Sequence, residues 1–186
     1  MLDLAQEEHT GLRFTGEKLQ HADLSEAVLR GCVFEQCDLS GADLTSAVLE
    51  GCALLGCRLE RARLGFSRWS DCKTTGTTFL RCELRPMTVE GGDWSYATFR
   101  GADLRGVSLA GVRLAEADFG DADLRTCDLT GADLSHARLR GVRLQGADLR
   151  GADLSGCEVD LVDWAGVRID VETAVLLARS RGADVG

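Results

Sequence analysis

The chain has 186 residues, 45% of them hydrophobic, with 30 acidic and 21 basic side chains and a net charge of −9. This length favours a single domain, and the acidic balance disfavours direct binding to nucleic acid. The start, Met1 to Leu4, does not resemble a signal peptide, and no stretch approaches the roughly 20 apolar residues of a membrane span, so we expect a cytoplasmic protein without a membrane partner.

Residues 1–13 carry a weak form of a five-residue pattern that becomes strict from Phe14 onward. Leu4 fits the pattern, whereas His9 does not. We expect residues 1–13 to form an N-terminal cap over the open end of the repeat that follows.

In residues 14–169 every fifth residue is large and apolar. Of these 32 positions from Phe14 to Ile169, only Thr74 is not Leu, Phe, Trp, Val or Ile. The residue two places before each centre is small, most often Ala or Cys. A period of five is neither the 3.6 of a helix nor the 2 of a flat strand, so it predicts a repeat protein. The central and small residues are expected to face the interior and the remaining positions to face outward.

Units such as Ala102–Leu104 and Ala147–Leu149, with the pattern Ala-Asp-Leu, resemble those of the pentapeptide-repeat family. The resemblance implies an all-β fold, a right-handed quadrilateral β-helix in which four units close one coil of 20 residues. Residues 14–169 would form about eight coils, hydrogen-bonded about 4.8 Å apart as neighbouring strands are. Inner residues 20 apart would then stack, so we expect the rings of Phe79, Phe99 and Phe119 to form one column.

All eight cysteines occupy the small inner position, interchangeably with Ala. We therefore expect reduced thiols packed in the core rather than disulfides or a metal site. The positions are Cys32, Cys37, Cys52, Cys57, Cys72, Cys82, Cys127 and Cys157.

No constellation of catalytic residues stands out. The histidines His9, His21 and His136 are far apart in the register, and no glycine-rich phosphate loop joins a strand to a helix. We expect a protein that is not an enzyme and needs no metal or cofactor.

The pattern is weakest between Ser67 and Ala97, where polar residues replace several inner ones. Pro86, the only proline, falls here at a corner. Either it bends the chain or adopts a cis bond, or the corner simply tolerates it. Phe66, Leu80 and Tyr96 point outward by register; they form either a patch for a partner or scattered surface residues.

Residues 170–186 leave the five-residue period and predict a helix. Asp170 suits its N-cap and Gly182 its C-terminal end. We expect this helix to cap the last coil and also to join two copies of the chain as a homodimer through Val171, Val175 and Ala178. Capping alone is the alternative.

The charges divide the chain into three parts. Residues 1–60 have 11 acidic and 4 basic groups (net −7), residues 61–115 have 5 and 9 (net +4), and residues 116–186 have 14 and 8 (net −6).

One outward column is acidic at six of eight positions and could occupy a groove that binds duplex DNA. An acidic face that is merely solvated is the alternative. The column reads Asp23, Asp43, Arg63, Glu83, Asp103, Asp123, Arg143 and Asp163.

The order of the proline segment and the C-terminal motifs resembles that of the fluoroquinolone-resistance members of the pentapeptide-repeat family. The matching segments are residues 82–89, 101–106, 162–164 and 166–175. The resemblance implies a DNA mimic that dimerises through its C-terminal end and binds DNA gyrase, a type II topoisomerase, inhibiting it or protecting it from the drug. The carboxylates expected to meet gyrase are Asp103, Asp118, Asp123, Asp128, Asp148 and Asp163.

Two other functions remain open at this stage. The same rod could be an immunity protein that protects a producer of a gyrase-targeting antibiotic. Alternatively it could be a general interaction scaffold with a partner other than gyrase, using Phe66, Leu80 and Tyr96. Mimicry predicts that binding weakens as salt rises, whereas an apolar interface does not.

Overall fold

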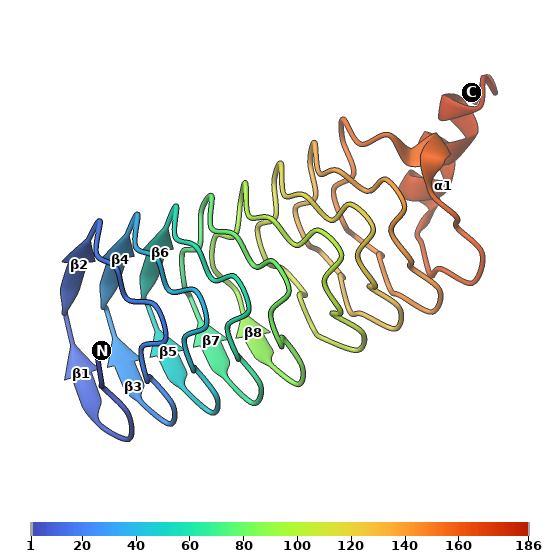
Figure 1. Cartoon of the computed structure of the whole chain (residues 1–186). Helices are drawn as coiled ribbons and strands as arrows, with labels where there is room; N and C mark the ends of the chain where they lie inside the picture. The colour runs from blue at the N-terminus through green and yellow to red at the C-terminus, as the bar shows by residue number, and fades with distance from the viewer. Residues whose placement is uncertain (1, 186) are drawn as a thin grey trace.

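A computed structural model describes residues 2–185 as one elongated coil that ends in a helix (Figure 1). Its strands are short, three residues each, and all belong to the first 90 residues. The elements in chain order are β1 (Glu8–Thr10), β2 (Arg13–Thr15), β3 (Val28–Arg30), β4 (Val33–Glu35), β5 (Val48–Glu50), β6 (Ala53–Leu55), β7 (Arg68–Ser70), β8 (Thr88–Glu90), the 3-10 helix η1 (Val159–Leu161) and α1 (Val171–Ser180).

Neighbouring coils pair in parallel between residues 20 apart. The strands form one sheet in the order β1-β3-β5-β7-β8 and a second in the order β2-β4-β6. Isolated bridges continue the pairing from Asp3 with Asp23 to Asp148 with Arg168. These bridges span residues 3–168, or about eight coils, and the predicted right-handed quadrilateral β-helix with a short C-terminal α-helix is confirmed.

The outward residue before each centre influences whether a side of the coil is a strand or a turn. Where it is Asp, its Oδ1 accepts a hydrogen bond from the backbone N–H two residues on, as Asp23 does from Ser25 at 3.0 Å and Asp128 from Thr130 at 3.0 Å. Such local bonds stabilise turns. At Val28 in β3, where this residue is β-branched, the side extends into a strand, whereas Thr78 and Thr98 form only isolated bridges.

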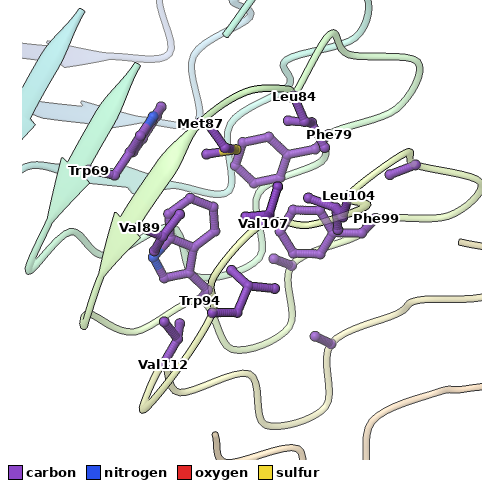
Figure 2. Close-up of a cluster of buried hydrophobic side chains, with 14 of the residues drawn as sticks. Trp69, Phe79, Leu84, Met87, Val89, Trp94, Phe99, Leu104, Val107 and Val112 are labelled. Carbon is purple, nitrogen blue, oxygen red and sulfur yellow. The ribbon is translucent and has the colours of Figure 1, made fainter. Parts of the chain in front are cut away.

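The interior is a continuous apolar column, and its middle part is aromatic (Figure 2). The ring centroids of Phe79 and Phe99 are 4.9 Å apart and those of Phe99 and Phe119 are 5.2 Å apart, both pairs nearly parallel. The predicted ring column is therefore confirmed. Trp94 stacks on Phe79 at 5.5 Å and meets Trp69 edge to face at 5.5 Å.

The cysteines are free thiols, as expected. Six are buried, and several donate to a backbone carbonyl of the preceding coil, as Cys57 Sγ does to Phe34 O at 3.2 Å. Burial raises the pKa of Cys57 to about 11 and that of Cys127 to about 12. These thiols therefore remain protonated and serve as small core residues.

The N-terminal boundary differs from the sequence prediction. Asp3 already bridges to Asp23, and β1 pairs with β3, so residues 3–13 form part of the first coil rather than a separate cap. The apolar pattern fades there because no earlier coil covers these residues: Leu4, Leu12 and Phe14 are only half-buried.

Two further places depart from the regular repeat. The Arg85–Pro86 peptide bond is cis, which decides between the two possibilities left open for this corner. Near the C-terminus, η1 replaces one regular side, and Gly146 N bonds to Gly166 O, one residue beyond the usual 19-residue step. The repeat thus loosens before α1 begins.

Helix α1 starts as predicted, because the Asp170 side chain accepts a hydrogen bond from Thr173 N at 2.9 Å. Thr173 is buried, and Leu176 and Leu177 pack against the core. The helix therefore covers the end of the last coil. Within residues 2–185 no helix is long and apolar enough to cross a membrane.

Candidate partner-binding surface

The six carboxylates expected to bind a partner lie on three consecutive sides of the coil. Asp103 and Asp123 are bridged neighbours in one column, and Asp128 and Asp148 are bridged neighbours in the next. Asp118 lies in the column on the other side, bridged to Arg138. The structure therefore does not gather the six into one cluster.

Asp123 is the centre of a small arginine cluster. Its Oδ2 lies 2.8 Å from Nη2 of Arg125, 2.9 Å from Nη2 of Arg143 and 3.6 Å from Nε of Arg105. Its side chain is only 6% exposed. Hydrogen bonds from Arg125 lower the pKa of this carboxyl, so it is ionised at neutral pH but covered by guanidinium groups.

Asp103 and Asp148 are held in the same manner by the arginine two residues on. Arg105 binds Asp103 through Nε at 2.9 Å and Nη2 at 2.7 Å, and Arg150 binds Asp148 at the same two distances. These paired hydrogen bonds lower the pKa of each carboxyl to about 2. The side of the coil that the sequence predicts to be an acidic ladder is here an alternation of carboxylate and guanidinium.

Asp118 is also compensated, though more loosely. Its Oδ2 lies 3.6 Å from Nη1 of Arg100 and 3.9 Å from Nη1 of Arg138, while its Oδ1 accepts from Gly120 N at 2.9 Å. Four of the six predicted carboxylates are therefore paired with arginine.

Asp128 and Asp163 are the two exposed carboxylates of the set, and neither forms an ion pair within residues 2–185. Asp128 Oδ1 accepts a hydrogen bond from Thr130 N at 3.0 Å, and Asp163 Oδ2 accepts one from Gln145 Nε2 at 3.1 Å. Both carboxylates are open to solvent, with no arginine of the described residues paired to them.

Three further exposed acidic residues near the C-terminal end escaped the sequence prediction. Two lie at η1, and the third lies on the side before it, still bridged in register to Asp133. No arginine of the described chain pairs with them. They are Asp153, Glu158 and Asp160.

A short sequence pattern distinguishes the carboxylates that are tightly paired with arginine from those that are not. Each tightly paired Asp begins an Asp-Leu-Arg triplet, as in Asp103–Arg105, Asp123–Arg125 and Asp148–Arg150. Residues on either side of an inward centre point to the same outward side, so the Arg meets its own Asp. Asp128 and Asp163 are followed two residues on by Thr130 and Ala165 instead.

The expected dimer residues lie along one face of α1. Val171, Ala174, Val175 and Ala178 have the spacing i, i+3, i+4 and i+7 of a single helix stripe. Val171 is 73% exposed, and Val175 and Ala178 are half-buried. This stripe, with exposed Leu161 on the neighbouring η1, leaves an apolar surface at the C-terminal end.

The fold and its outward columns define the class of this protein. The family model for pentapeptide repeats matches residues 18–54 and 117–156, and the model for a pentapeptide repeat region matches residues 42–119. Together they cover residues 18–156. The chain belongs to the pentapeptide-repeat family.

Individual relatives include proteins connected with drug resistance. The chain is 41% identical over 91 residues to pentapeptide repeat protein MfpA of Mycobacterium tuberculosis, an alignment that covers 49% of this chain and 50% of that relative. The match therefore spans about half the length of this curated relative.

Among solved structures, a trypsin-treated form of QnrB1, a plasmid-mediated fluoroquinolone resistance protein, superimposes with a TM-score of 0.82 at 26% identity. The match covers 100% of this chain and 98% of that one. Full-length QnrB1 gives a TM-score of 0.68 at 22% identity over 95% of this chain, which shows the shared fold alone.

Proposed function

We propose that this protein binds DNA gyrase as a mimic of duplex DNA, competes with DNA and modulates or protects against fluoroquinolone poisoning. The observation that carries the proposal is the whole-length likeness to QnrB1, described as a fluoroquinolone resistance protein. The sequence likeness to MfpA supports the same assignment over half the chain.

The dimensions of the rod are compatible with mimicry. About eight coils at about 4.8 Å per coil give a length of about 38 Å, close to one turn of B-DNA at about 34–36 Å. DNA of that length carries roughly 22 charges, whereas this chain has a net charge of −9. Binding would therefore depend on particular surfaces rather than on total charge.

The electrostatic structure of the outward columns indicates which carboxylates contribute most. Of the six predicted residues, Asp128 and Asp163 would attract a cationic groove most strongly, because arginines do not neutralise them. Asp153, Glu158 and Asp160 extend this acidic surface at the C-terminal end. The other four predicted carboxylates are paired with arginine, so they would contribute less to electrostatic steering and more to the shape of the surface. They are Asp103, Asp118, Asp123 and Asp148.

A homodimer would place two such acidic ends side by side. Val171, Val175 and Ala178 would form its interface, with Leu161 at the margin. Two rods joined at their C-terminal ends would double the length to roughly 76 Å, or about two turns of duplex DNA.

The test is a supercoiling assay with purified gyrase, with and without ciprofloxacin, at several salt concentrations. We expect dose-dependent inhibition of supercoiling or relief of drug-induced cleavage, weakening as salt rises. Asp128→Lys with Asp163→Lys should reduce the effect about tenfold or more. A matched control, Glu17→Lys with Glu35→Lys, makes the same charge change at the N-terminal end and should keep the effect. Inactivity of the native protein at micromolar concentration would contradict the proposal.

A further inference from the structure

A shallow groove runs along one corner of the rod where the coils containing Phe66 and Pro86 meet. It consists of two adjoining hollows, of about 400 Å³ and about 230 Å³, that share Pro86. We call it the Pro86 groove and define it by Pro86 together with Val48, Phe66, Arg68, Arg85, Met87 and Arg105.

The groove has an apolar surface that the folded chain leaves uncovered. Phe66 is 67% exposed and occupies a corner with a φ of 63°, a backbone conformation that disfavours bulky residues. Positive φ recurs at other corners of the repeat, as at Arg61 and His136, so the argument depends on the exposure of a large aromatic side chain beside Pro86. Met87, buried beside the aromatic interior, forms part of the floor (Figure 2).

The charged side chains that line the groove are all arginines. Arg68 is exposed and forms no ion pair within residues 2–185. Arg85 and Arg105 both bind Asp103, and Arg105 also lies 3.6 Å from Asp123, which is itself shared with Arg125 and Arg143. Arginines therefore outnumber carboxylates around the groove. Two larger hollows, around His21 and His136, are lined by both acidic and basic side chains. The Pro86 groove is thus a cationic and apolar surface on an acidic protein.

The length of the groove indicates how much of a partner it holds. From Val48 to Val107 it crosses three successive coil spacings, or about 14 Å. An extended peptide rises about 3.3–3.6 Å per residue, so about four residues would fill it.

We propose that the Pro86 groove binds an extended acidic peptide segment of a partner protein. An apolar side chain of that segment packs on Phe66 and Pro86, and its carboxylates pair with Arg68 and with Arg85. Charge complementarity selects this occupant: a short segment meets the local excess of arginine, whereas a nucleic acid strand would also face the acidic parts of a protein of net charge −9. The groove adjoins Asp103 of the proposed gyrase-binding surface, but its test does not depend on gyrase activity.

The probe is an array of six-residue peptides that combine Asp or Glu with Leu, Ile, Phe or Trp, with matched arrays in which Lys replaces the acidic residues. Binding of the full chain is measured by fluorescence, and affinities of the strongest peptides by anisotropy. We expect the acidic apolar peptides to be selected and to lose about tenfold or more in affinity with Phe66→Asn or Arg68→Glu. Asn is compatible with the backbone at this corner, so Phe66→Asn keeps the fold.

Two matched variants serve as controls. Tyr96→Asn removes the other exposed aromatic with positive φ, which lies at a different corner, and Arg58→Glu reverses an exposed arginine elsewhere. Both should keep the peptide affinity within about twofold. Absence of acidic peptides among the binders, equal selection of the Lys array, or unchanged affinity in Phe66→Asn would overturn the proposal. Displacement of the peptides by a single-stranded oligonucleotide that binds more tightly would overturn it in favour of nucleic acid.

Discussion

The N-terminal coils, residues 3–90, and the C-terminal coils, residues 91–168, share one interior but differ on the outside. In the first group one or two sides of each coil contain a strand, with outward residues such as Val28, Val48 and Ala53. In the second group the strands give way to isolated bridges, and the outward residues are mainly Asp and Arg. The difference indicates that the interior fixes the winding of the chain, while the outward residues set the charge and, where they are Asp, stabilise a local turn.

The largest effect is expected from the interior, where the two groups should not differ. Leu49 and Leu124 are fully buried, one in each group. We expect Leu49→Ala and Leu124→Ala each to lower the free energy of unfolding by about 2–5 kcal/mol, because each leaves a cavity among packed side chains. Urea unfolding followed by circular dichroism measures both. A loss in only one group would show that the interiors are not equivalent.

An intermediate effect is expected on the outside of the C-terminal coils. Asp123→Ala removes both the turn bond and the contacts with three arginines, so we expect a loss of about 1.5–3 kcal/mol. Asp128→Ala removes mainly a turn bond and should cost about 0.5–1.5 kcal/mol. Equal losses of unfolding free energy in the two variants, measured by the same unfolding experiment, would mean that the arginine cluster around Asp123 adds nothing to stability.

A smaller effect is expected in the acid dependence of stability. The pKa of Asp103, about 2 in the folded protein, lies below its ordinary value near 3.8. The ionised carboxyl therefore stabilises the fold above about pH 4, and this contribution is lost as the pH falls through about 2. We expect Arg105→Gln to raise that pKa and flatten the dependence of the urea midpoint between about pH 4 and 2. Carboxyl NMR titration of Asp103 that shows no change would contradict the assignment.

The smallest effect concerns a corner of the N-terminal coils. Phe66→Asn replaces a bulky residue at positive φ by one that tolerates this conformation. We expect the free energy of unfolding to rise by up to about 1 kcal/mol. A decrease in the free energy of unfolding would indicate that Phe66 stabilises the coil through packing. It would contradict the view that Phe66 is retained at this corner for binding at the expense of stability.

The sequence predicts the interior almost completely. The five-residue period places Leu124, Trp94 and Cys57 inside, and Asp170 marks the start of α1, because these features depend on local pattern and side-chain size. The pairing of Asp123 with Arg143 was not predicted, because it depends on two side chains 20 residues apart choosing compatible rotamers. The N-terminal boundary was misplaced because an uncovered first coil needs no strict apolar pattern.

The four-sided period has a consequence for how such a chain can change. Duplicating 20 residues would lengthen the rod and leave every outward column on its own side. Deleting a single five-residue unit would keep the interior pattern but rotate everything beyond it by a quarter turn. The Asp103 side would then continue onto the side that now carries Asp128. Insertion or deletion of a five-residue unit would therefore rotate the outward columns on one side of the change relative to those on the other. The corner between two units allows this rotation without a change in the interior pattern.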